Sequence, residues 1–122
     1  MFVPLHDGTP LKIIRFQFVT VAIILANTAV YLATGAFSSD QALTTIATGY
    51  GVVPGEITGQ IAPYGFHPVP EPLTFITYMF LHGSWWHLIT NMLFLWVFAD
   101  NIEDAFGYCA FAIFYLLCGL AA

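Results

Sequence analysis

Three stretches of the chain carry no Asp, Glu, Lys or Arg: residues 16–39, 72–99 and 105–122. A helix needs about 20 mainly apolar residues to cross the ~30 Å hydrocarbon core of a bilayer. The first stretch meets that length. A cleavable signal peptide is the competing interpretation, because "ATGA" at residues 33–36 loosely resembles a cleavage site. The apolar region of a signal peptide is only about 7–15 residues long, which favours an uncleaved transmembrane helix over residues 16–37.

The second stretch predicts a transmembrane helix over residues 73–104, with its most apolar part at 85–98. Trp85 and Trp86 lie at one end of that part, and tryptophan favours the headgroup level of a membrane. The acidic run "DNIED" marks the other end. The pattern therefore predicts a helix with an aromatic end and an acidic end.

The third stretch predicts the start of another transmembrane helix over residues 108–122. At 1.5 Å per residue such a helix reaches only about 22 Å, and no polar or aromatic anchor closes it. A charged carboxyl terminus inside hydrocarbon is costly. We therefore expect the chain to be the amino-terminal portion of a longer membrane protein.

The composition supports a membrane protein. Only 7% of the residues are charged, 59% are hydrophobic, and the mean hydropathy is +0.82. A soluble domain carries about 25% charged residues. The net charge of −5 and a total of two basic residues exclude nucleic acid as a partner. The predicted fold class is an all-α polytopic transmembrane helix bundle, with two complete spans and the start of a third.

The two basic residues also predict the orientation. Lys12 and Arg15 directly precede the first predicted span, so residues 1–15 should form a cytoplasmic amino-terminal segment. Residues 38–72 then form a long outer loop, which holds five of the seven prolines and cannot be one continuous helix.

Two polar side chains stand out in the second predicted helix. His87 and Asn91 are four residues apart, so they lie on one face of a helix. If the interface is at the tryptophan pair, Asn91 lies about 8–9 Å below it, where an amide needs partners inside the protein. The residues alone leave two hypotheses open: hydrogen bonding between helices, or a functional cluster.

A metal site is not favoured. His82 and His87 are five residues apart with Gly83 between them, and no Cys or carboxylate is near them in sequence. His67 lies in the predicted loop without a second ligand at a metal-like spacing. The sequence implies neither a metal nor an organic cofactor.

The segment "FLHGSWWHLITNMLFLWVFADNIEDAFG" closely resembles the second transmembrane helix of rhomboid intramembrane serine proteases. The shared pattern is His-Gly-x-Trp-x-His, then His-x-x-x-Asn, an apolar run, and Asp-Asn-x-Glu-Asp followed by glycine. The resemblance implies that His87 and Asn91 line the catalytic cavity and help to bind the oxyanion. It implies structural roles for His82, which helps to hold the outer loop, and for Glu103, at the cytoplasmic end. The implied partners are the lipid bilayer, transmembrane protein substrates and the remaining helices of the full-length protein. The opening "PLHDGTPLKIIRFQFVT" and the closing "FYLLCGLAA" resemble bacterial members, which implies the bacterial inner (plasma) membrane as the location.

The chain also departs from the family pattern. Thr90 and Ala99 occupy places where many relatives have glycine. The catalytic histidine of a later helix is missing, and so is the Gly-x-Ser-Gly of the nucleophile. Ser84, although it adjoins the histidines, is in no such context. The resemblance thus implies part of a serine endopeptidase that is inactive as residues 1–122 alone. The alternatives are a rhomboid-like protein that binds transmembrane clients without cutting them, and an unrelated transporter or scaffold.

Overall fold

The computed structural model describes residues 8–63 and 65–122, and every regular element in these residues is helical. In this respect the predicted all-α fold is confirmed. Residues 1–7 of the predicted amino-terminal segment 1–15 lie outside the described part. The elements are α1 (Phe18–Thr34), α2 (Asp40–Tyr50), α3 (Pro54–Ile57), α4 (Glu71–Thr77), the 3-10 turn η1 (Tyr78–Phe80), α5 (Trp85–Phe94), the π-helical stretch η2 (Leu95–Ala99), α6 (Asp100–Phe106) and α7 (Tyr108–Ala121).

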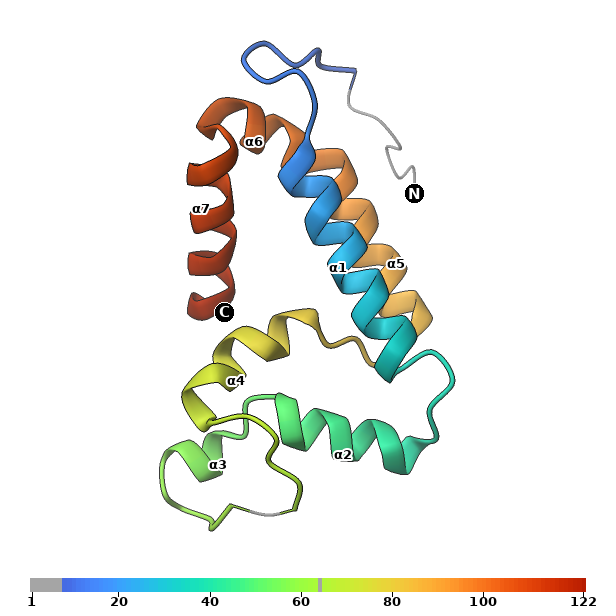
Figure 1. Cartoon of the computed structure of the whole chain (residues 1–122), viewed down its shortest axis with the longest axis vertical. Coiled ribbons are helices and arrows are strands. Elements are labelled where there is room, and N and C mark those ends of the chain that lie inside the picture. The colour runs from blue at the N-terminus through green and yellow to red at the C-terminus, as the bar shows by residue number, and fades with distance from the viewer. Residues whose placement is uncertain (1–7, 64) are drawn as a thin grey trace.

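Helix α1 lies side by side and antiparallel with α5 and its continuation η2, and α7 stands on the other side of α1 (Figure 1). The short helices α2, α3 and α4 gather at the end of the molecule where α1 ends and α5 begins, and α6 lies at the opposite end. Among the described residues, the buried apolar side chains come from α1, α5, η2 and α7: Tyr31, Leu88, Val97, Ala99 and Phe111. The fold therefore has a loop end and an α6 end, joined by packed helices.

The helix bounds differ from the predicted spans. The predicted helix 16–37 corresponds to α1, which has 17 residues, and the predicted helix 73–104 is divided among α4, η1, α5, η2 and α6. The predicted start of a helix at 108–122 corresponds to α7. Within residues 8–63 and 65–122, no single helix combines the length and the apolar character needed to cross a bilayer.

The second predicted helix is interrupted at residues 81–84. Leu81 has extended backbone angles, and so does Ser84, with φ −160° and ψ 159°. The Ser84 Oγ accepts a hydrogen bond from the His87 backbone N–H at 3.1 Å, which satisfies one of the free amides in the first turn of α5. Gly83 precedes it and disfavours helix. These two residues explain why α5 begins at Trp85 rather than continuing from α4.

The predicted outer loop 38–72 contains two helices that the sequence analysis did not anticipate. Ser39 caps α2 by accepting a hydrogen bond from the Ala42 N–H at 3.3 Å. Helix α3 carries a proline at its first position, where the missing N–H costs nothing. The Thr77 hydroxyl donates to the Tyr50 carbonyl, which ties the end of α2 to α4. The loop is thus folded against the ends of the long helices.

At the α6 end, two carboxylates hold the beginning of the chain. Glu103 is fully buried, and its oxygens accept hydrogen bonds from the Val19 N–H at 2.9 Å, the Thr20 N–H at 2.8 Å and the Thr20 hydroxyl at 2.6 Å. Gln17, the residue before α1, makes no capping side-chain bond. A carboxylate from a distant helix therefore caps α1 and lies favourably at the positive end of its dipole.

Asp104, the next residue of α6, binds the segment that leads into α1. Its carboxylate accepts hydrogen bonds from the backbone N–H groups of Lys12 at 2.8 Å, Ile13 at 2.7 Å and Ile14 at 2.7 Å. Gly107 then reverses the chain with φ +78°, a conformation that favours glycine, and α7 follows. The acidic run thus fixes the entry into α1 and leads directly to α7.

Candidate functional site

Three of the predicted polar residues meet at the start of α5. His82 comes from the link between η1 and α5, and His87 and Asn91 come from successive turns of α5. The Asn91 Nδ2–H donates to the His82 Nε2 at 3.3 Å. The two imidazole rings meet edge to face, with their centroids 5.1 Å apart. We call His82, His87 and Asn91 the polar cluster.

The cluster has a buried side and an open side. His82 is buried, with 8% of its surface exposed, whereas His87 and Asn91 are exposed in the part of the chain that the structure describes. Leu88, which follows His87, is turned into the core with 3% exposed. Helix α5 therefore packs through its Leu88 face and presents the His87 and Asn91 side chains on an accessible face.

The sequence predicted that His87 and Asn91 share a helix face, and the structure places both on α5. The sequence did not predict that His82 contacts Asn91. Nine residues separate the two, and the contact depends on the bend at residues 81–84 that directs His82 back toward α5. Gly83 could have indicated the bend at residues 81–84, but a glycine alone does not specify the direction in which the chain bends.

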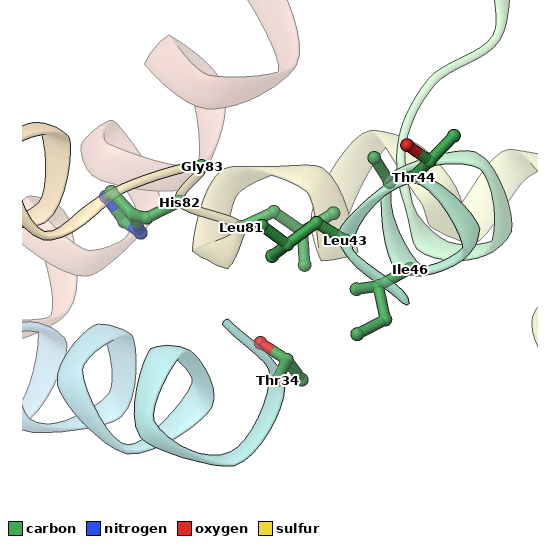
Figure 2. Close-up of a pocket in the computed structure, with 8 residues that line it drawn as sticks. Thr34, Leu43, Thr44, Ile46, Leu81, His82 and Gly83 are labelled. Atoms are coloured by element: carbon green, nitrogen blue, oxygen red, sulfur yellow. The ribbon is translucent and has the colours of Figure 1, made fainter. Parts of the chain in front are cut away.

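A pocket of about 270 Å³ adjoins His82 on the loop side. Figure 2 shows Leu81 beside Leu43 of α2, with Thr34 of α1 and Ile46 of α2 across the space, and His82 at one end. The polar cluster therefore lies next to a partly apolar hollow formed by α1, α2 and the link before α5. The side chains of this hollow are mostly uncharged.

Ser84 lies next to the polar cluster and has a structural role there as the N-cap of α5. Its hydroxyl oxygen is used to cap α5 through the His87 N–H. The described residues bring no carboxylate to the polar cluster, so nothing in this part of the chain completes a serine–histidine–carboxylate arrangement around Ser84.

No group of three His, Cys, Asp or Glu side chains among residues 8–63 and 65–122 is arranged to hold a metal ion. The sequence analysis treated His67 as an ordinary loop residue. The structure places the His67 Nε2 3.6 Å from a carboxylate oxygen of Glu56, within the loop. His67 therefore contributes to the structure of the loop. It is distant in sequence from the polar cluster, and its ion-pair partner Glu56 is also a loop residue.

Comparison with known proteins finds a family match for the segment that carries the polar cluster. Residues 70–122, which run from the start of α4 to the last residue, match the Rhomboid domain. The chain is 31% identical over 67 residues to "Rhomboid-like protein 11, chloroplastic" of Arabidopsis thaliana, a match that covers 55% of this chain and 24% of that protein. No solved structure matches.

The match covers about a quarter of the length of this curated relative. The match to the Rhomboid domain over residues 70–122 includes all three residues of the polar cluster and the acidic run of α6. These matches weigh against the alternative of an unrelated transporter or scaffold. The segment that carries the cluster, residues 70–122, is similar to the Rhomboid domain, and the two matches together support a relationship of this chain to the rhomboid family.

Proposed function

We propose that this chain is the amino-terminal part of a rhomboid-type serine endopeptidase that hydrolyses peptide bonds of membrane proteins within the bilayer. The observation that supports this most directly is the placement of His87 and Asn91 on one face of α5. Both carry N–H donors, both are exposed on one helix, and both lie in the segment that matches the Rhomboid domain.

The chemistry of peptide hydrolysis gives these donors a use. When a serine oxygen attacks the carbonyl carbon, the serine proton passes to a base and negative charge develops on the carbonyl oxygen. Donors at 2.7–3.1 Å from that oxygen stabilise the transition state more than the ground state. In this proposal a His87 ring N–H and an Asn91 Nδ2–H bind the oxyanion. The remaining helices of the full-length protein supply the nucleophile and the base.

Experiments on the complete protein distinguish this function from that of a rhomboid-like protein that binds transmembrane clients without cutting them. We expect it to cleave a transmembrane substrate in vesicles and to be labelled by a fluorophosphonate probe that reacts with activated serines. Residues 1–122 alone should do neither, because neither a Gly-x-Ser-Gly nor the catalytic histidine lies within them. A complete protein that binds transmembrane segments but shows no cleavage and no labelling would reject the endopeptidase.

Ser84 provides a separate test. In the complete protein, Ser84→Ala should remove the cap of α5 and lower the stability by about 0.5–2 kcal/mol. Fluorophosphonate labelling should persist. Ser39→Ala is the matched control, because Ser39 caps α2 in the same way and lies outside the polar cluster. Loss of labelling in the Ser84 variant alone would instead identify Ser84 as the nucleophile.

We propose a membrane location with the amino terminus in the cytoplasm, as the basic residues Lys12 and Arg15 indicate. The rhomboid family is membrane-associated, and the relative found here is a chloroplast protein. The bacterial inner membrane is part of the proposal. A reporter fused after Gly107 should be cytoplasmic and one fused after Gly35 should be external; the opposite pattern would reject this orientation.

A further inference from the structure

We propose that His82 is a positioning residue that holds the Asn91 amide in the orientation needed to donate to an oxyanion. This inference rests on the proposed endopeptidase function and adds a third residue to its machinery. His82 acts through Asn91 and need not touch the substrate. The His82 ring makes two hydrogen bonds, one through each nitrogen.

The first bond fixes the position of the proton on the His82 ring. The Nδ1 atom lies 3.3 Å from the Phe80 carbonyl oxygen. A carbonyl oxygen can only accept, so the hydrogen must be on Nδ1. In the neutral ring the other nitrogen, Nε2, then carries a lone pair and is an acceptor.

The second bond fixes the orientation of the amide. An Nε2 acceptor requires a donor, and the Asn91 group at 3.3 Å is Nδ2–H. The amide oxygen of Asn91 is consequently turned away from His82. One Nδ2–H is used by the imidazole, and the second remains available to another acceptor.

This orientation matters because an asparagine amide has a donor end and an acceptor end. Rotation by 180° exchanges them and would place a partly negative oxygen where an anion must bind. Asn91 is exposed in the described part of the chain, so packing alone does not prevent that rotation. The bond to His82 does so, because only the Nδ2 end can pair with an Nε2 lone pair.

His82 is itself well placed to act as a fixed support. It is 92% buried, its backbone lies in the short link that precedes α5, and its ring meets the His87 ring edge to face. The link is anchored by the hydrogen bond from the Leu81 N–H to the Tyr78 carbonyl at 3.1 Å. A support of this kind aligns a donor before the charge develops, which is how preorganised sites lower a barrier.

The kinetic test is a double-mutant cycle in the complete protein, with kcat and KM measured on a transmembrane substrate. His82→Ala should lower kcat about tenfold to 100-fold with little change in KM, since small misplacements of a catalytic group have effects of that size. In an Asn91→Ala background the same change should have less than about a twofold effect, because residues that act as a unit are not additive. Equal effects of His82→Ala in both backgrounds would overturn the proposal and leave a structural role.

Two further variants sharpen the cycle. His82→Gln offers a carbonyl oxygen as a substitute acceptor and should recover part of the lost kcat, whereas His82→Leu should recover none. His67→Ala is the matched control, a histidine of the loop whose partner is Glu56, and it should leave kcat unchanged. Equal activity of the Gln and Leu variants would contradict an acceptor role for His82.

A spectroscopic readout separates this inference from the proposed function. In the complete protein with ¹⁵N-labelled histidine, His82 should show a protonated Nδ1 and an unprotonated Nε2, and the Nε2 signal should shift in Asn91→Ala. An Nε2-protonated ring, or an Nε2 signal that is indifferent to Asn91, would overturn the positioning role whatever the activity. If the complete protein proves inactive, the proposed function is rejected. The tautomer of the His82 ring still tests whether its Nε2 accepts a hydrogen bond from Asn91.

Discussion

Asn91→Ala in the complete protein is expected to lower turnover about 10²–10³-fold while thermal unfolding stays close to that of the parent. Loss of one oxyanion donor removes roughly 2.7–4 kcal/mol of transition-state stabilisation. Asn91 is exposed on α5, so its truncation leaves no large cavity. His87→Ala should behave alike, because the second proposed donor comes from the next turn of the same face.

The competing hypothesis, in which Asn91 only joins helices, gives a different result. An interhelical hydrogen bond in a membrane protein contributes about 0.6–1.7 kcal/mol, and activity would then fall only as far as the fold does. Turnover and unfolding are therefore measured on the same preparations. Thr90→Ala is the control on α5, since its hydroxyl donates to the backbone oxygens of Trp86 and His87 within the same helix. Parallel loss of stability and turnover in Asn91→Ala would reject the oxyanion role for that residue.

Glu103→Ala is expected to destabilise the complete protein by about 3–5 kcal/mol. The change removes three hydrogen bonds to a buried carboxylate, each with a net contribution of about 1.5–3 kcal/mol, and some of this loss is offset by relaxation or water entry. The Val19 and Thr20 amides at the start of α1 would lose their partner. The measurement is denaturant or thermal unfolding in the same detergent or bicelle for every variant.

Two comparisons define the Glu103 effect. Glu103→Gln keeps one oxygen but turns an amide NH₂ toward a backbone or hydroxyl donor, so it should recover only part of the stability. Asp40→Ala is the matched control, because Asp40 is an exposed acid in the first turn of its own helix, where such a charge contributes about 0.3–1 kcal/mol. Equal stability changes in Glu103→Ala and Asp40→Ala would contradict the capping role.

The sequence predicted what depends on local spacing. The all-helical fold follows from the apolar runs, and the four-residue spacing places His87 and Asn91 on one face of α5. Helix α2 was missed although its signal was present: Ser39 precedes a proline-free stretch, as a capping residue does. The prolines that follow concealed it, because they suggested a loop throughout residues 38–72.

Contacts between distant segments could not be predicted in this way. The resemblance implied a structural role for Glu103, but its donors on α1 are 83 and 84 residues away and no local pattern names them. The contact of His82 with Asn91 depends on the geometry of the bend before α5, which is a property of several backbone angles together.

The capping of α1 by α6 has a consequence for biosynthesis. The amide groups at the start of α1 leave the ribosome long before the carboxylate that receives them, since Thr20 and Glu103 are separated by 83 residues. Asp104 and its donors in residues 12–14 are separated by 90–92 residues. The first helix therefore reaches its final hydrogen bonding only after α6 has been synthesised, so its capping depends on a long-range contact. In a nascent chain arrested before Glu103, the Val19 and Thr20 amides at the start of α1 would lack their carboxylate cap and could bind a chaperone or a lipid headgroup instead.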